Sequence, residues 1–162
     1  MRLAGGYPWR MNQTPDTAPK TIAQPAALGF RLMALIYDCL PLIPLVMIVS
    51  ALFLWLNGGR TVEHDPVIAG AEFITLWLLI GTYFVASWRR GGQTVGMRPW
   101  RLKVVAADGR PASVRALWLR YAVAWLTPVV GLLWTLVDAE RRGLHDIASG
   151  TLFVRLQPAR RD

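Results

Sequence analysis

The chain has 162 residues, 54% of them hydrophobic, and a formal net charge of +8. This length is enough for one domain, and the hydrophobic residues stand in long blocks, which argues against an ordinary soluble domain. The charged residues lie between those blocks, so the basic charge predicts contact with anionic lipid headgroups and not with nucleic acid. The single cysteine, Cys39, excludes an intramolecular disulfide and a cysteine-based metal site.

Residues 1–25 are polar and rich in proline, which predicts a disordered tail. They lack a basic segment that runs directly into an apolar core, so a cleaved signal peptide is not expected. The remaining chain is predicted to form one membrane domain over residues 26–156, followed by a short tail over residues 157–162.

Two apolar blocks follow the tail. The first, residues 32–56, contains a single charged residue, Asp38, and the second, residues 67–88, contains only Glu72. A membrane-spanning helix needs about 20 residues, so both blocks are predicted to cross. Pro41 and Pro44 predict a kink in the first helix.

The segment after the second block, residues 89–115, differs in charge. It holds seven basic residues against Asp108, whereas the turn-rich linker 57–66 holds Arg60 against Glu63 and Asp65. By the positive-inside rule, segment 89–115 and the N-terminal tail are predicted to be cytoplasmic and the linker to lie outside.

The basic segment is also rich in glycine around "GGQTVGMRPW". It matches neither a phosphate-binding loop nor a dinucleotide fingerprint, so no cofactor is expected there. The glycines are interpreted as allowing tight turns at the membrane surface. Four arginines are candidate contacts for lipid phosphates: Arg89, Arg90, Arg98 and Arg101.

Two short segments have the composition of strands. Residues 101–106 alternate in polarity before an Asp-Gly turn, and residues 150–156 are rich in β-branched and aromatic side chains. Each segment is too short to be stable alone, so the two are predicted to pair as a small cytoplasmic sheet.

A third apolar block covers residues 116–137 and contains Arg120 and the pair Thr127-Pro128. One interpretation is a third full span, which would place the C-terminus outside. The other is a broken, re-entrant helix pair bent at Thr127-Pro128. The arginines that follow the block favour re-entry, as does the requirement that the two strands meet on one side.

Arg31 and Asp38 stand seven residues apart, so their side chains fall within about 20° of one helix face. A charge at the bilayer centre costs roughly 2.5–3.5 kcal/mol. Asp38 is therefore expected to face the protein interior near an arginine, either Arg31 or Arg120. Three roles stay open for it: a structural contact between helices, a carboxylate that handles protons or ions, and part of a ligand pocket.

A second polar pair, His145 and Asp146, lies near the C-terminus. The other histidine, His64, falls on the opposite side of the predicted membrane, so no metal site is expected. Asp146 is predicted to take the arginine that Asp38 leaves free, most simply Arg31. The sequence contains no nucleophile elbow and gives no positive sign of an enzyme.

Three separated motifs, "GFRLMALIYD", "GQTVGMR" and "LHDIASGT", occur in an order that resembles the RDD family of small bacterial membrane proteins. The resemblance covers roughly residues 26 to 156. It implies that Arg31, Asp38 and Asp146 are the arginine and two aspartates for which the family is named. The chain departs from the family pattern at three positions: Met97, Ile147 and Ser149.

The resemblance implies a multi-pass protein of the bacterial inner membrane, with transport of an ion or small ligand as one function. Because two or three spans are few for a pore, transport would require a homo-oligomer or a membrane protein partner. The rival function is a scaffold or accessory subunit in which the three charged residues are structural. The expected fold is mainly α, with two transmembrane helices, a third apolar segment and a two-stranded surface sheet.

Overall fold

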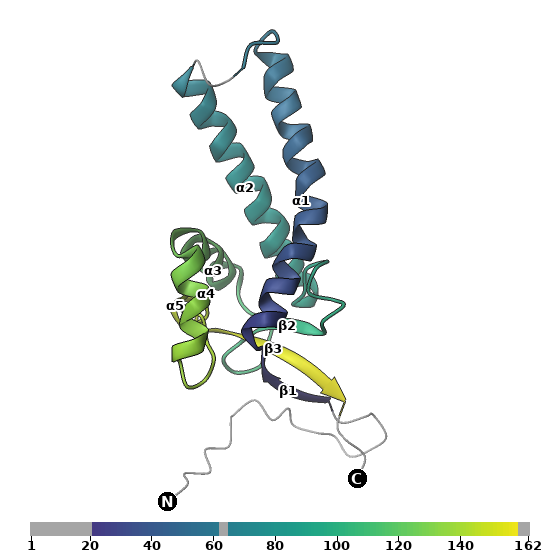
Figure 1. Ribbon diagram of the computed structural model, residues 1–162, viewed down its shortest axis with the longest axis vertical. Helices are drawn as coiled ribbons and strands as arrows, with labels where there is room; N and C mark the ends of the chain where they lie inside the picture. Colours follow the sequence, from purple (N-terminus) through teal and green to yellow (C-terminus); the bar gives the residue numbers. More distant parts are fainter. Residues whose placement is uncertain (1–20, 62–64, 159–162) are drawn as a thin grey trace, which may run out of the picture.

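The computed structural model describes residues 21–61 and 65–158. In this part of the chain the fold is mainly helical, as predicted, with one small sheet (Figure 1). The elements in chain order are β1 (Thr21–Pro25), α1 (Leu28–Leu56), α2 (Pro66–Gly91), β2 (Leu102–Ala106), α3 (Val114–Leu126), α4 (Pro128–Val137), α5 (Leu144–Ser149) and β3 (Thr151–Pro158).

The two long helices, α1 and α2, run side by side away from the sheet (Figure 1). With 29 and 26 residues, both are long and apolar enough to cross a membrane. Most of their apolar side chains are exposed, among them Leu40, Ile48 and Trp55. Exposed apolar surface of this extent is typical of helices that face lipid. Helix α1 continues through both of its prolines.

Local sequence explains where α2 begins and ends. The Asp65 carboxylate accepts hydrogen bonds from the backbone N–H groups of Val67 and Ile68, and Pro66 occupies the first helical position. At the other end Gly92 adopts a left-handed backbone conformation with φ of 72° and terminates the helix. Glycine adopts this conformation without the strain that a Cβ atom would cause.

The sheet is antiparallel, with strand order β1-β3-β2. The pairing of β2 with β3 confirms the predicted pair, with Val104 opposite Phe153. The strand β1 was not predicted: residues 21–25 were assigned to the disordered tail, yet they pair with the end of β3. Strand β3 also extends to Pro158, two residues into the predicted C-terminal tail, and residues 1–20 and 159–162 lie outside the described structure.

The third apolar block forms two short helices, α3 and α4, which meet at Thr127 with a bend of 101°. This bend confirms the predicted break at Thr127-Pro128. Pro128 is the first residue of α4, a position that suits proline because no hydrogen bond to its nitrogen is required there. At 1.5 Å per residue the two helices are only about 20 and 15 Å long, so neither is long enough to cross a bilayer alone.

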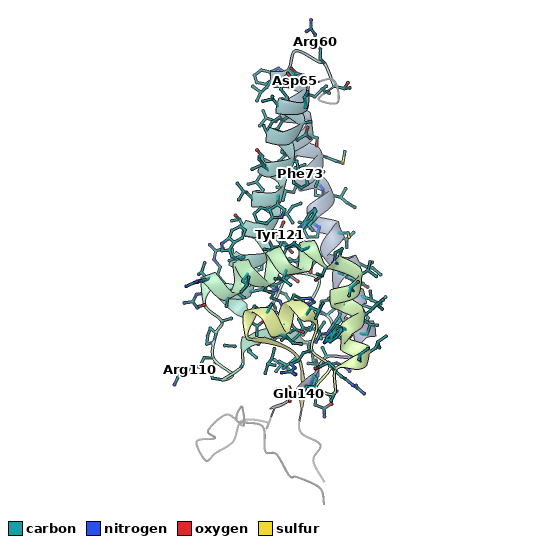
Figure 2. All side chains as sticks on the ribbon, turned by 90° about the vertical axis from the view of Figure 1, so that its left-hand side faces the viewer. Arg60, Asp65, Phe73, Arg110, Tyr121 and Glu140 are labelled. Carbon is teal, nitrogen blue, oxygen red and sulfur yellow. The ribbon has the colours of Figure 1, made fainter. Side chains whose placement is uncertain are left out.

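The buried core lies where the sheet meets the start of α1, the end of α2 and helix α3. Its fully buried members include Leu102, Met97 and Leu117. Helix α3 packs against α2 through aromatic rings: Trp77 lies 5.1 Å from Tyr121 and 5.9 Å from Trp118, measured between ring centroids. This packing fixes α3 against the lower half of α2, where Figure 2 places Tyr121 between the ends of the molecule.

Candidate functional site

Asp146 forms the centre of a buried ion-pair cluster. Its Oδ2 lies 2.6 Å from Nη1 of Arg31 on α1, and its Oδ1 accepts a hydrogen bond from Nη1 of Arg120 on α3. The exposed fractions of Arg31, Arg120 and Asp146 are 6%, 2% and 1%. One carboxylate on α5 therefore joins two guanidinium groups from different helices.

The two arginines extend this cluster to the surrounding backbone. Arg31 donates from Nε to the carbonyl oxygen of Ala26 at 3.1 Å and from Nη2 to that of Arg141 at 2.9 Å. Arg120 donates to Oγ1 of Thr151 at 2.7 Å. The cluster therefore links the start of α1, the α4–α5 loop, helix α3 and the start of β3.

Asp146 is ionised in this setting. Burial opposes its charge, but the guanidinium groups of Arg120 and Arg31 outweigh that effect and hold the pKa of the carboxyl well below its usual range. Burial, followed by the charge of Arg120, lowers the pKa of the neighbouring His145 to about 4, so the imidazole is neutral at pH 7. Two guanidinium groups and one carboxylate give the cluster a net charge of +1.

Asp38 occupies a separate buried site. Its Oδ1 accepts hydrogen bonds from the backbone N–H of Gly96 at 2.8 Å and the Tyr83 hydroxyl at 3.1 Å. Its Oδ2 accepts one from the Thr94 hydroxyl at 2.5 Å. The side chain is 3% exposed, which confirms the prediction of an interior position.

The predicted arginine partner of Asp38 was wrong. Among the described residues, no arginine lies within 4 Å of this carboxylate, and both candidate arginines pair with Asp146 instead. Two helical turns, about 10 Å, separate Asp38 from Arg31 along α1. Neutral donors from the "GQTVG" segment fill the space around Asp38. The predicted pairing of Asp146 with Arg31 is confirmed, and Arg120 shares it.

The sequence interpretation missed Tyr83, Thr94 and Gly96 as partners of Asp38. The sequence feature that points to these partners is the compact "GQTVG" segment, whose glycines are interpreted above only as allowing turns at the membrane surface. Thr94 and Gly96 face α1 from within this segment, and both are buried. Glu72, the charged residue of the second apolar block, also accepts a hydrogen bond from a neutral donor: the Ser50 hydroxyl lies 2.5 Å from its Oε1.

The four arginines named as lipid-phosphate candidates are all exposed: Arg89, Arg90, Arg98 and Arg101. None of them forms an ion pair with another described residue, so their role at a lipid surface stays a prediction. Within residues 21–61 and 65–158, no group of three or more histidine, cysteine, aspartate or glutamate side chains could hold a metal ion.

A cavity of about 440 Å³ lies between α1, α2, the α3–α4 pair and α5. Three charged side chains, Arg31, Asp38 and Arg120, line it together with the imidazole of His145. The rest of the wall is mainly apolar and aromatic, including Phe84, Trp88, Met97, Tyr121, Trp125 and Leu132. This volume falls within the range of pockets that hold small molecules.

The fold and these sites define a small helical protein with two helices of membrane-spanning length and a buried cluster of two arginines and an aspartate that joins α1 to α3 and α5. The chain belongs to the RDD family, which matches residues 25–150. It is similar to the uncharacterized protein YckC of Bacillus subtilis (strain 168), with 29% identity over 145 residues, 85% of this chain and 89% of the relative.

A second relative is the uncharacterized protein RP437 of Rickettsia prowazekii (strain Madrid E). It is 31% identical over 85 residues, which cover 51% of this chain and 48% of that protein. No solved structure gives a significant match. The cluster around Asp146 and the site around Asp38 thus contain the arginine and the two aspartates that the resemblance to the family implied.

Proposed function

We propose that this chain is a non-enzymatic, multi-pass protein of the bacterial inner membrane, in which Arg31, Asp38 and Asp146 are structural residues of a scaffold. The observation that carries this proposal is the position of Asp146, whose two oxygens bind arginines from α1 and α3 while Gly143 donates its backbone N–H to Oδ2 at 2.8 Å. Three donors from the protein thus engage the two carboxylate oxygens. Asp38 is similarly engaged by three donors.

The energetics of buried ion pairs support a structural role. Removing one partner of such a pair leaves the other charge buried and unpaired, at a cost of about 3–5 kcal/mol. That is a large part of the 5–15 kcal/mol by which domains are usually stable. A cluster that joins α1, α3 and α5 therefore decides whether these helices stay together.

The sheet supports a particular arrangement in the membrane. Strands β1, β2 and β3 come from before α1, after α2 and after α5, and hydrogen-bonded strands must lie on the same side of a bilayer. Helices α1 and α2 then form a hairpin of two spans, and α3 with α4 re-enters without crossing. The charge of segment 89–115 supports a cytoplasmic location for this side, where the exposed Arg89, Arg90, Arg98 and Arg101 would meet anionic headgroups.

One observation favours a second function, transport of an ion or small ligand: Asp38 lines the cavity between the helices. A carboxylate at the wall of an intramembrane cavity can bind a cation or a proton. In this case two spans would form a path only in a homo-oligomer or with a membrane protein partner.

Flux measurements separate the two functions. Wild-type protein and Asp38→Asn would be reconstituted in liposomes, with proton or sodium flux read by an enclosed dye, and their melting temperatures would be measured in detergent. The scaffold function predicts no flux by the wild type and a lower melting temperature for the variant. Wild-type flux that is lost in a variant of unchanged melting temperature would establish transport. Asp108→Asn, at an exposed position, is the matched control.

A further inference from the structure

We propose that the cavity between α1, α2, α3–α4 and α5 is a binding site for an amphiphile with a singly charged anionic head and an apolar chain. The head would bind at Arg120 and Trp88, and the chain would extend along the apolar wall towards the membrane. This site goes beyond the scaffold function, because the ion pairs of Asp146 form whether or not the cavity is occupied.

The first argument is charge. Arg31 and Arg120 share a single carboxylate, and all three side chains are buried, so the cluster keeps a net charge of +1 next to the cavity. Neutral His145 does not change this balance. Contacts with aromatic rings, such as that of Arg31 over Phe153 at 4.7 Å, offset only part of a buried charge. The Asp38 carboxylate lines the same cavity but lies about 10 Å along α1 from Arg31 and pairs with neither arginine, so one monovalent anion beside Arg120 would neutralise the cluster locally.

The second argument is the set of unused donors. Within the described chain, Arg120 donates hydrogen bonds only from Nη1, which leaves its Nε and Nη2 groups without an acceptor. The indole N–H of Trp88 is buried and also lacks a partner among the described residues. Both residues line the cavity, and the Arg120 guanidinium lies 5.4 Å from the centre of the Trp88 ring. Such donors suit a carboxylate or phosphodiester oxygen.

The third argument is the opening of the cavity. Three of its lining residues are exposed and apolar: Leu35 on α1, Trp125 on α3 and Pro128 at the start of α4. They lie on helices whose other exposed residues are mostly apolar, so the cavity opens towards the side that would face lipid. A ligand entering from there needs an apolar chain. The remaining charged residue of the wall, Asp38, is already satisfied by three donors, so a cation finds no free carboxylate.

Calorimetric titration of the full chain in a nonionic detergent tests the proposal. Laurate is the probe, and dodecanol, which has the same chain without the charge, is its control. We expect laurate to bind at least tenfold more tightly than dodecanol. Lysophosphatidylglycerol, which has a phosphodiester head group, separates the two kinds of anionic head. If this lipid binds and laurate does not, the site is assigned to a phosphodiester headgroup. Equal affinities for laurate, lysophosphatidylglycerol and dodecanol, or no binding of any of them, would overturn the proposal.

Trp88→Phe removes the indole donor and keeps a ring in the wall, so its folding is testable separately by melting temperature. Loss of a hydrogen bond to a charged group should weaken binding of the anionic probe about tenfold or more. Trp55→Phe, at an exposed position near the far end of α1, is the matched control and should bind as the wild type does. Unchanged affinity in a folded Trp88→Phe protein would contradict the proposed site. A dimer in which a second copy of the chain fills the cavity would also contradict it.

Discussion

The backbone N–H of Gly96 donates a hydrogen bond to Oδ1 of Asp38, with 2.8 Å between nitrogen and oxygen. This contact holds the "GQTVG" segment against the second and third turns of α1. A side chain at position 96 has no room, because a Cβ there would lie 2.6 Å from the backbone nitrogen of Asp38. A buried acid and a glycine 58 residues away thus act as one structural unit.

Gly96→Ala should therefore destabilise the protein by about 1–3 kcal/mol, the usual cost of forcing extra volume into a packed site. The added methyl group meets rigid backbone of α1 and cannot be relieved by a side-chain rotation. Thermal melting in detergent measures the effect. Gly91→Ala is the matched control, because a Cβ at position 91 meets no atom within 4 Å. Equal melting temperatures for the two variants would show that the segment does not pack on α1 as described.

The Thr94 hydroxyl contributes a second test of the Asp38 site. Thr94→Val keeps the shape of the side chain but removes the donor to Oδ2, leaving a buried carboxylate oxygen unsatisfied. A hydrogen bond to a charged group is worth about 1.5–3 kcal/mol, and the melting temperature should fall accordingly. Thr82→Val is the control, because Thr82 is exposed and its hydroxyl bonds only to its own helix, at Leu78. A smaller loss for Thr94→Val than for Thr82→Val would contradict the site.

The sequence predicted the long helices, the break at Thr127-Pro128 and the pairing of β2 with β3, because each depends on local signals: apolar length, proline and alternation. It also placed Asp38 in the interior, since an unpaired charge in hydrocarbon is costly, and it paired Asp146 with Arg31. It did not predict which donors Asp38 would receive. That choice depends on how the turns of segment 92–101 fold back on α1, a three-dimensional property that spacing along one helix cannot specify. Strand β1 was missed because its sequence, TIAQP, is short and continues a proline-rich tail.

His145 predicts a pH dependence of stability. Its pKa is about 4 in the folded protein and about 6.5 when unfolded, so the unfolded chain binds the extra proton first. Stability is therefore full above pH 6.5 and falls as the pH is lowered towards 4, by an amount on the order of 3 kcal/mol. His145→Gln should flatten the melting-temperature profile between pH 6.5 and 5, above the range where unfolded carboxylates titrate. An unchanged profile in His145→Gln would contradict the neutral, buried imidazole.

Asp146→Asn tests the ion-pair cluster. An amide offers one acceptor oxygen and no charge to two buried guanidinium groups, so the loss of stability should reach about 3–5 kcal/mol. The protein is expected to be recovered in low yield or to melt many degrees below the wild type. Asp108→Asn breaks an exposed pair with Arg110 at 3.8 Å and should change stability by no more than about 0.5 kcal/mol. Similar melting temperatures for the two variants would mean that the cluster does not hold the helices together.

The sheet makes a prediction about topology. In the proposed arrangement the hydrogen-bonded strands β2 and β3 lie on one side of the membrane, so the chain between them is expected to leave and return on that side, with α3 and α4 re-entering without a full span. Figure 2 places Arg60 at one end of the molecule and Arg110 and Glu140 at the other. In a background where Cys39 is replaced by serine, cysteines at positions 110, 140 and 157 should react with a membrane-impermeant reagent only from the cytoplasmic side. A cysteine at position 60 should react only from outside. Labelling of position 157 from outside, with position 110 protected there, would refute the re-entrant arrangement of α3 and α4.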